Sequence, residues 1–219
     1  MSDMGTPGPE RQRRRPDQPI VAFDFDGTLT VRDSFTAFLR DQAGPTRWAL
    51  GLIRLAPALA AYLADRDRGR LKAASVREFL GGLPLATLEA ESEAFADKVW
   101  TRFMRPDALA CWEDWGRRGA YRVIVTASPE TTVTPFARRL GADALLGTPL
   151  AFDADGRVTG GFARPNCRGE EKVRRLQESF GAPLVLEAAY GDTSGDTEML
   201  AIAKASGFRV FTRSPPKTS

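Results

Sequence analysis

The amino-acid sequence predicts an α/β protein with a doubly wound (Rossmann-like), mainly parallel sheet and an inserted all-α segment. Apolar runs typical of buried strands alternate with helix-like segments along most of the chain, as in a parallel sheet covered by helices on both faces. Residues 34–105 break this alternation, because they are rich in Ala, Leu and Arg and lack a strand-like pattern. At 219 residues, of which 42% are hydrophobic, the chain can bury a sizeable core as one domain with an insertion.

The composition excludes several classes of function. Histidine is absent, which removes His-based triads and leaves acid–base catalysis to carboxylates, lysines or water. The net charge is only +3, so no nucleic-acid partner is expected. Cys111 and Cys167 are far apart and have no metal-like spacing, which suits a reducing cytosol and predicts a cytoplasmic protein.

Residues 1–18 are predicted to form a disordered basic tail. They are rich in Pro, Gly and Arg and lack the apolar segment of a signal peptide. The arginines within residues 11–15 could meet nucleic acid or anionic lipid, the latter at roughly 1 kcal/mol per basic residue near a membrane surface. A solvated basic leader is the favoured interpretation.

The first strand carries two carboxylates at its end. Residues 21–25 are β-branched and aromatic, as in a central strand, and ligands of such sheets bind beyond the carboxyl ends of the strands. Asp24 and Asp26, two apart, can lean toward one site, and Gly27 lets the backbone turn close to a ligand. Two carboxylates this close are costly unless a metal ion or a lysine lies between them. An Asp-Gly turn is the simpler alternative, but the run Asp-Phe-Asp-Gly-Thr-Leu-Thr at 24–30 is far more specific.

Three further segments follow in a fixed order. A strand over residues 121–126 leads to Ser128, residues 166–172 place Lys172 at a helix start, and an apolar strand leads to Asp192 and Asp196. Taken singly, Ser and Lys are weak signals, since they are more often a helix cap and a solvated charge. Together with residues 24–30, these segments resemble the four motifs of the haloacid-dehalogenase-like phosphatases.

The resemblance implies an Mg²⁺-dependent phosphatase that hydrolyses a phosphate monoester through an aspartyl-phosphate. Asp24 would be the nucleophile and Asp26 the general acid and base. Relatives that cleave carbon–halogen or carbon–phosphorus bonds generally lack the second acid, which favours a phosphatase. The transferring phosphate would be held by Gly27, Thr28, Ser128 and Lys172. The Mg²⁺ ligands implied are Asp24, the carbonyl of Asp26 and Asp192, with Asp196 either a direct ligand or a residue that supports one.

Residues 34–105 lie between the first and second motifs, where one subset of the family carries a helical cap. The catalytic core is therefore expected to comprise residues 19–33 and 106–213. Helices are predicted within the cap at 34–42, 46–64, 73–80 and 85–104, with a break at Gly81 and Gly82.

The remaining core elements follow from periodicity and from Pro and Gly signals. Helices are predicted over residues 106–118, 129–140, 170–180 and 196–205. Strands are predicted at 184–189 and 208–211, and a hairpin at 152–158. Residues after Thr212 are expected to fray.

Residues 48–63 are apolar almost all round, interrupted by Arg54 and Pro57. The segment is too short to cross a bilayer, which takes about 20 apolar residues. Two interpretations remain: burial inside the cap, or contact with a lipid surface. The second would place the protein peripherally at the inner face of the membrane.

The position of the cap resembles the subgroup that contains phosphoserine phosphatase and the C-type phosphatidylglycerophosphate phosphatases. Asp33 stands where phosphoserine phosphatases typically have Glu, which argues against phosphoserine. The partner is thus predicted to be a phospholipid head group, such as that of phosphatidylglycerophosphate, or a phosphorylated small molecule. A non-enzymatic regulator that binds a phosphorylated ligand is the alternative from another class, and the intact catalytic positions argue against it.

Overall fold

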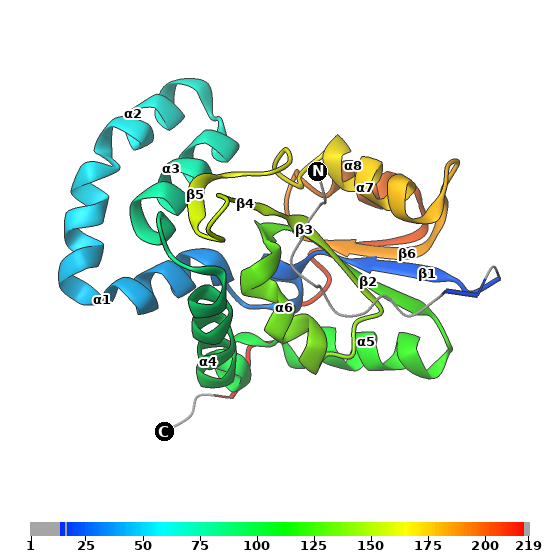
Figure 1. The fold of residues 1–219 in the computed structure, drawn as a ribbon. Helices are drawn as coiled ribbons and strands as arrows, with labels where there is room; N and C mark the ends of the chain where they lie inside the picture. Colours follow the sequence, from blue (N-terminus) through cyan, green and yellow to red (C-terminus); the bar gives the residue numbers. More distant parts are fainter. Residues whose placement is uncertain (1–13, 16, 217–219) are drawn as a thin grey trace.

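The computed structural model describes residues 14–15 and 17–216 and shows a parallel sheet flanked by helices, with a helical block beside it (Figure 1). The five strands of the sheet run parallel in the order β3-β2-β1-β6-β7. Their bounds are Ile20–Phe23 (β1), Tyr121–Pro129 (β2), Ala144–Thr148 (β3), Leu186–Gly191 (β6) and Ala203–Phe208 (β7). The doubly wound parallel fold is as predicted.

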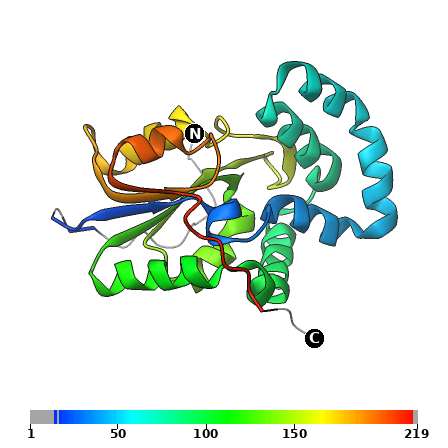
Figure 2. The same cartoon turned by 180° about the vertical axis from the view of Figure 1, so that it is seen from behind.

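Strand β1 lies at the centre of the sheet and is buried on both faces. Val21 and Phe23 share an apolar cluster with helices α5 (Pro106–Arg117) and α6 (Glu130–Arg139). Ile20 and Ala22 face the opposite cluster, which helices α7 (Glu170–Phe180) and α8 (Thr197–Ala201) cover. Figures 1 and 2 show these two helical layers on either side of the sheet. This double cover explains why the strand is apolar without alternation.

The helical block comprises α1 (Ser34–Arg54), α2 (Ala56–Asp65), α3 (Arg68–Leu80) and α4 (Leu85–Phe103). Two of its helices begin at aspartates, because Asp33 accepts a hydrogen bond from the Thr36 amide at 2.6 Å and Asp67 one from the Arg70 amide at 3.0 Å. Helices α1 and α2 form an arc that projects away from the sheet (Figure 1).

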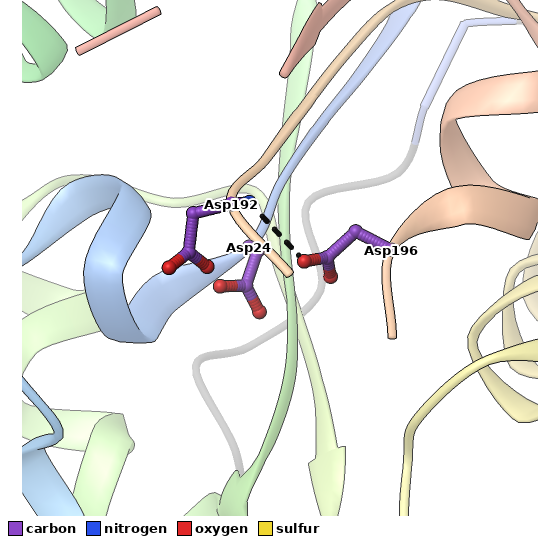
Figure 3. Close-up of side chains that lie close together, drawn as sticks. All are labelled: Asp24, Asp192 and Asp196. Atoms are coloured by element: carbon purple, nitrogen blue, oxygen red, sulfur yellow. Dashed lines mark hydrogen bonds between the residues drawn. The ribbon is translucent and has the colours of Figure 1, made fainter. Parts of the chain in front are cut away.

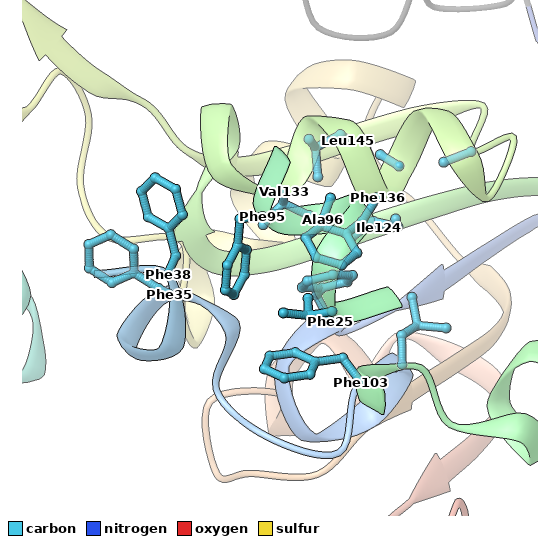
Figure 4. Packing of buried hydrophobic residues seen from close by; sticks show 14 of the residues in the cluster. Phe25, Phe35, Phe38, Phe95, Ala96, Phe103, Ile124, Val133, Phe136 and Leu145 are labelled. Atoms are coloured by element: carbon cyan, nitrogen blue, oxygen red, sulfur yellow. The ribbon is translucent and has the colours of Figure 1, made fainter. Parts of the chain in front are cut away.

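Phenylalanines join the helical block to the sheet layer (Figure 4). Phe95 of α4 packs against Phe38 of α1 and Phe136 of α6, with ring centroids 5.5 and 6.4 Å apart. Phe136 in turn lies 5.2 Å from Phe25, which follows the first strand. Helix α4 and the start of α1 thus belong to the main hydrophobic core.

The chain enters and leaves the helical block through paired backbone. The Val31 amide donates to the Phe103 carbonyl at 2.8 Å, and the Arg105 amide donates to the Leu29 carbonyl at 2.9 Å. A second contact is made by the antiparallel hairpin of β4 (Leu150–Phe152) and β5 (Val158–Phe162). Val158 exchanges backbone hydrogen bonds with the loop after α3, accepting from Gly82 at 2.8 Å and donating to Leu83 at 3.0 Å.

The predicted helix boundaries in the block need correction. The helix predicted over residues 46–64 is divided at Leu55, because Pro57 lies in the first turn of α2 and cannot donate a hydrogen bond to the preceding turn. The helix predicted over 73–80 begins five residues earlier, at the Asp67 cap.

The helix predicted over residues 196–205 is confirmed only for its first half, and the strand predicted at 208–211 is misplaced. Helix α8 ends at Ala201, and the alanine-containing stretch that follows forms β7, which pairs with β6 at the edge of the sheet. Backbone pairing at this edge outweighs the helix preference of alanine. Strand β6, predicted at 184–189, is shifted by two residues and ends at Gly191.

The termini of the core are attached to α5 and its surroundings. The expectation that residues after Thr212 fray is wrong at its start, because the amides of Thr212 and Arg213 donate to the Asp107 carboxylate at 2.7 and 2.9 Å. At the other end, the Gln18 side chain donates to the Gly119 carbonyl at 3.0 Å. Residues 1–13 and 16 of the predicted basic tail lie outside the described residues.

The apolar segment at residues 48–63 is not buried on all sides. Five of its large side chains are between 47% and 70% exposed: Leu50, Leu52, Ile53, Leu59 and Leu63. The interpretation as an ordinary buried cap helix is therefore wrong for these side chains.

Across the described part of the chain, no helix is long and apolar enough to cross a membrane.

Candidate active site

Strands β1, β2 and β6 deliver polar side chains to one edge of the sheet. Asp24 follows β1, Ser128 lies near the end of β2, and Asp192 follows β6. The strand order reverses between β1 and β6, the position at which open α/β sheets bind ligands. A cavity of about 440 Å³ opens there, and Asp24, Asp26 and Asp192 line it.

Asp24 forms a buried ion pair with Lys172. The Lys172 Nζ atom, from the first turn of α7, lies 2.6 Å from Asp24 Oδ1. Burial raises the pKa of Asp24 to about 7, although the Lys172 ammonium acts against the rise. Because this pKa is close to neutral pH, the Asp24 carboxyl group loses its proton readily when a further cation binds beside it.

Lys172 has all three of its N–H donors engaged. They reach the Asp24 carboxylate, the Asp196 carboxylate and the Val125 carbonyl, each at 2.6 Å. Burial alone would lower the pKa of Lys172, but the two carboxylates hold it above its ordinary value. The sequence predicts Lys172 as a phosphate contact, whereas here its three donors reach the two carboxylates and the Val125 carbonyl.

Asp196 organises the loop after β6. Its Oδ2 atom accepts hydrogen bonds from the Asp192 amide at 3.2 Å and from the Thr193 amide at 3.0 Å. Burial acts to raise its pKa, but Lys172 and the hydrogen bonds from Thr193 lower it below the ordinary value. Asp196 therefore stays ionised and holds Asp192 in place.

Asp192 offers an oxygen without a partner. Its Oδ1 atom is buried and makes no hydrogen bond within the described residues. Figure 3 shows the side chains of Asp24, Asp192 and Asp196 close together, and one oxygen of each lies within 4.8 Å of the others. An unpartnered carboxylate oxygen beside a second carboxylate fits a hard cation such as Mg²⁺, which binds through one or two carboxylates and several waters.

Asp26 is fixed by two donors. The Ser34 amide donates to Oδ1 at 2.7 Å, and the Ser128 hydroxyl donates to Oδ2 at 2.5 Å. Burial and the charge of Asp33 raise the pKa of Asp26, and the two hydrogen bonds act against the rise. Because its pKa is raised, the Asp26 carboxyl group holds a proton more readily than an ordinary aspartate does. Ser128, predicted to contact phosphate, donates its single hydroxyl proton to Asp26 in this structure.

The two remaining predicted residues also lie beside the carboxylates. Gly27 lines the cavity with a φ of 86°, a value that L side chains rarely adopt. The Thr28 side chain is buried beneath it, with its hydroxyl 3.3 Å from Asp24 Oδ2.

Sequence reasoning missed most of the basic side chains around the cavity. They come from four segments far apart in the chain and comprise Arg32, Arg68, Lys72, Arg105 and Arg168. Lys72 of α3 donates to the Ala127 carbonyl at 2.9 Å, next to Ser128. Arg168 lies within one of the four motifs, but no pattern in α3 distinguishes Lys72 from its basic neighbours.

A parallel sheet that ends in clustered carboxylates and a buried lysine defines the class of this protein. The model of the haloacid dehalogenase-like hydrolase family matches residues 21–201. The chain belongs to this family, and it carries a helical segment between its first and second motifs.

Among individual relatives, the chain is 58% identical over 196 residues to the protein CicA of Caulobacter vibrioides, covering 90% of this chain and 88% of CicA. It is 30% identical over 190 residues to the phosphoserine phosphatase of Halobacterium salinarum, covering 83% of this chain and 81% of that protein. The solved structure of a phospho-aspartyl intermediate analogue of phosphoserine phosphatase shares the fold, with a TM-score of 0.57 and 20% identity, covering 86% of this chain and 85% of the other.

Proposed function

We propose that this hydrolase is an Mg²⁺-dependent phosphatase that cleaves a phosphate monoester through an aspartyl-phosphate at Asp24. The observation that supports this most directly is the pairing of Asp24 with Lys172, beside a second carboxyl group, Asp26, whose pKa is raised. A nucleophile and a proton donor then lie in one cavity, with basic residues at its wall.

The proposed reaction has two steps. In the first, an Asp24 carboxylate oxygen attacks phosphorus, the bond from phosphorus to the ester oxygen breaks, and the Asp26 carboxyl group gives its proton to the departing alkoxide. In the second, water attacks the phosphorus of the acyl phosphate, Asp26 takes the proton of that water, and inorganic phosphate leaves the restored Asp24 carboxylate. For phosphate to be held by Ser128, its hydroxyl must turn from Asp26 toward the substrate.

The residues present fit Mg²⁺. Asp24 and Asp192 would hold the ion together with the Asp26 carbonyl, since Asp192 Oδ1 is buried and unpartnered within the described residues. Asp196 would not bind the ion directly, because Lys172 and the loop amides already engage both of its oxygens, and it would instead hold Asp192 in position. Bound Mg²⁺ would neutralise charge on the transferring phosphate.

We also propose that residues 34–105 act as a cap over a core made of residues 19–33 and 106–213. Arg68 and Lys72 of α3 line the cavity that contains the catalytic carboxylates, so the helical block reaches the site directly. A cap in this position would exclude water and select the leaving group.

Two substrate classes have specific support. The exposed apolar side chains at residues 48–63 favour a lipid phosphate, such as phosphatidylglycerophosphate, met by a cytoplasmic protein at the inner face of the membrane. The name of the Halobacterium relative favours a soluble phosphoserine-like metabolite. A non-enzymatic role as a phospho-ligand-binding regulator is disfavoured by the complete set of catalytic carboxylates.

An assay with an aryl phosphate tests the proposed chemistry. The wild-type protein should release phosphate with Mg²⁺ and lose activity on chelation, and an acid quench during turnover should trap phosphate on the protein. The Asp24→Asn variant should do neither. A protein that binds aryl phosphate without turnover at any Mg²⁺ concentration would instead be a regulator.

A further inference from the structure

The helical block contains an apolar groove that the catalytic chemistry does not use. It encloses about 510 Å³, and its walls are mainly aliphatic and aromatic side chains of α1, α2 and α3, among them Trp48, Leu52, Leu55, Leu59, Leu71 and Phe79. This volume is in the range of roughly 300–1,000 Å³ typical of small-molecule sites. The groove is open at its outer rim, where Leu52 and Leu59 are 47% and 49% exposed.

The inner end of the groove meets the catalytic cavity. Arg68 and Lys72 line both spaces, so the two share a wall made of cations. The Lys72 ammonium lies 5.7 Å from the centroid of the Phe35 ring on the groove side and donates to the Ala127 carbonyl on the catalytic side. A ligand that follows this path passes from apolar walls to two cations and then to Asp24.

We propose that the groove binds the apolar chain of the substrate, so that the substrate is an amphiphile: the phosphate monoester of an alcohol that carries a long hydrocarbon chain. This inference rests on the proposed phosphatase function and assigns its substrate class. The phosphate lies at Asp24, Arg68 and Lys72 contact the charged head group, and the chain extends past Leu55 and Phe79 toward the open rim.

The shape and the charges favour a chain over other occupants. A flat bilayer surface would contact the outward side chains Leu50, Ile53 and Leu63, which do not line the groove, and would leave the concave interior unfilled. A second copy of the protein would gain nothing from cations at the inner end, whereas an anionic head group is held there by both.

The chain-length dependence of turnover tests the proposal. Butyl, octyl and dodecyl phosphates, each below its critical micelle concentration, are compared by kcat/KM in the wild type. Each methylene that enters the groove should raise kcat/KM by up to about fourfold, until the groove is filled. A flat response across the three esters would overturn the proposal.

Two double variants within residues 48–63 provide a matched comparison. Leu52→Ser with Leu59→Ser changes the groove wall and should lower the dodecyl-to-butyl ratio of kcat/KM by about tenfold. Leu50→Ser with Ile53→Ser removes two exposed apolar side chains that lie outside the groove and should leave the ratio within about twofold of wild type. All four side chains are about half exposed or more, so folding should survive, as thermal melting will check. Ser75→Trp, which fills the groove from α3, should also lower the ratio. Equal losses in both double variants would overturn the proposal.

A binding measurement separates this inference from the proposed function. Calorimetry on the Asp24→Asn protein should show tighter binding of dodecyl phosphate than of butyl phosphate. If no ester is turned over, the phosphatase assignment fails. Equal binding of the two esters would in addition overturn the assignment of the groove as the site of the hydrocarbon chain.

Vesicles of phosphatidylcholine and phosphatidylglycerol test the membrane alternative. Vesicle binding lost in the Leu50/Ile53 variant, together with a flat chain-length response, would assign the apolar surface to membrane docking instead.

Discussion

Gly27 lies so close to Asp192 that a Cβ atom at position 27 would be 2.2 Å from the Asp192 Oδ2 atom. The backbone of Gly27 also has a φ of 86°, which strains any L side chain. The turn after the first strand therefore fits against the proposed metal ligand only without a side chain.

Gly27→Ala should displace Asp192 and lower kcat/KM by about 10- to 100-fold, with a higher Mg²⁺ concentration needed for half-maximal activity. Gly161→Ala is the matched control, since a Cβ there would meet no atom within 4 Å. Steady-state kinetics over a Mg²⁺ titration measures both. An unchanged Mg²⁺ requirement in Gly27→Ala would contradict the assignment of Asp192 as a ligand.

Asp24→Asn should lower kcat by about 10⁴-fold or more while the far-ultraviolet circular dichroism stays unchanged, because the amide fills the same space but cannot attack phosphorus. Asp155→Asn, in the exposed hairpin turn, should keep wild-type activity. Wild-type kcat in purified Asp24→Asn would exclude the aspartyl-phosphate.

Mg²⁺ binding should release protons at pH 6. Burial raises the pKa of Asp24 to about 7, so in the metal-free protein most molecules carry this proton at pH 6, and a metal ligand must lose it. The number of protons released should fall as the pH rises from 6 to 8, because Asp24 is then already ionised. Calorimetry in buffers of different ionisation enthalpy measures this number. A binding enthalpy that does not depend on the buffer at pH 6 would rule out this linkage.

Lys172→Met should lower the free energy of unfolding by about 3–5 kcal/mol, because it leaves the buried carboxylates of Asp24 and Asp196 without their counter-charge. Lys204→Met is the matched control, since its ion pair with Glu187 is exposed and its loss should cost less than about 1 kcal/mol. Denaturant unfolding compares the two variants. Similar losses would show that the buried pair contributes no more than a surface pair.

Asp107→Ala should release the segment at Thr212 and Arg213, whose amides donate to that carboxylate. Partial burial opposes ionisation, but these hydrogen bonds lower the pKa of Asp107, so the contact stabilises the fold above its unfolded-state pKa and weakens only as the pH falls through the lowered value. We expect a loss of about 1 kcal/mol at pH 7 and faster hydrogen exchange at the two amides. Unchanged exchange rates in the variant would show that other contacts hold this segment.

The features that depend only on the order of residues along the chain could be predicted from the sequence. Asp24 and Asp192 each follow an apolar strand, and Ser128 lies near the end of another. Parallel strands bring their carboxyl ends to one edge, so the order of the residues alone predicts their proximity. Prediction failed where the helix preference of a segment opposed the pairing offered by a neighbouring strand. The stretch Ala203–Phe208 has alanines that favour a helix, and only its neighbour β6 makes it a strand.

Contacts made by the helical block could not be predicted in the same way. Helix α3 carries several basic residues, and which of them reaches the carboxylates depends on how the block docks on the sheet. Lys72 and Arg68 face the cavity, whereas Arg77 packs at Gly160 of the hairpin. The engagement of Lys172 by three acceptors likewise depends on how α7 packs against β2 and against the residues that follow β1 and β6.

The hydrogen bonds that Val158 makes with Gly82 and Leu83 attach the helical block to the hairpin, in addition to the paired backbone at its entrance and exit and the phenylalanine contacts of α4. A movement of the helical block away from the active site must break these hydrogen bonds or carry the hairpin β4–β5 with it. Along the chain, the hairpin follows β2, which contains Ser128, and precedes α7, which contains Lys172. If the hairpin moves with the block, the chain between β5 and α7 connects that movement to the helix that bears Lys172.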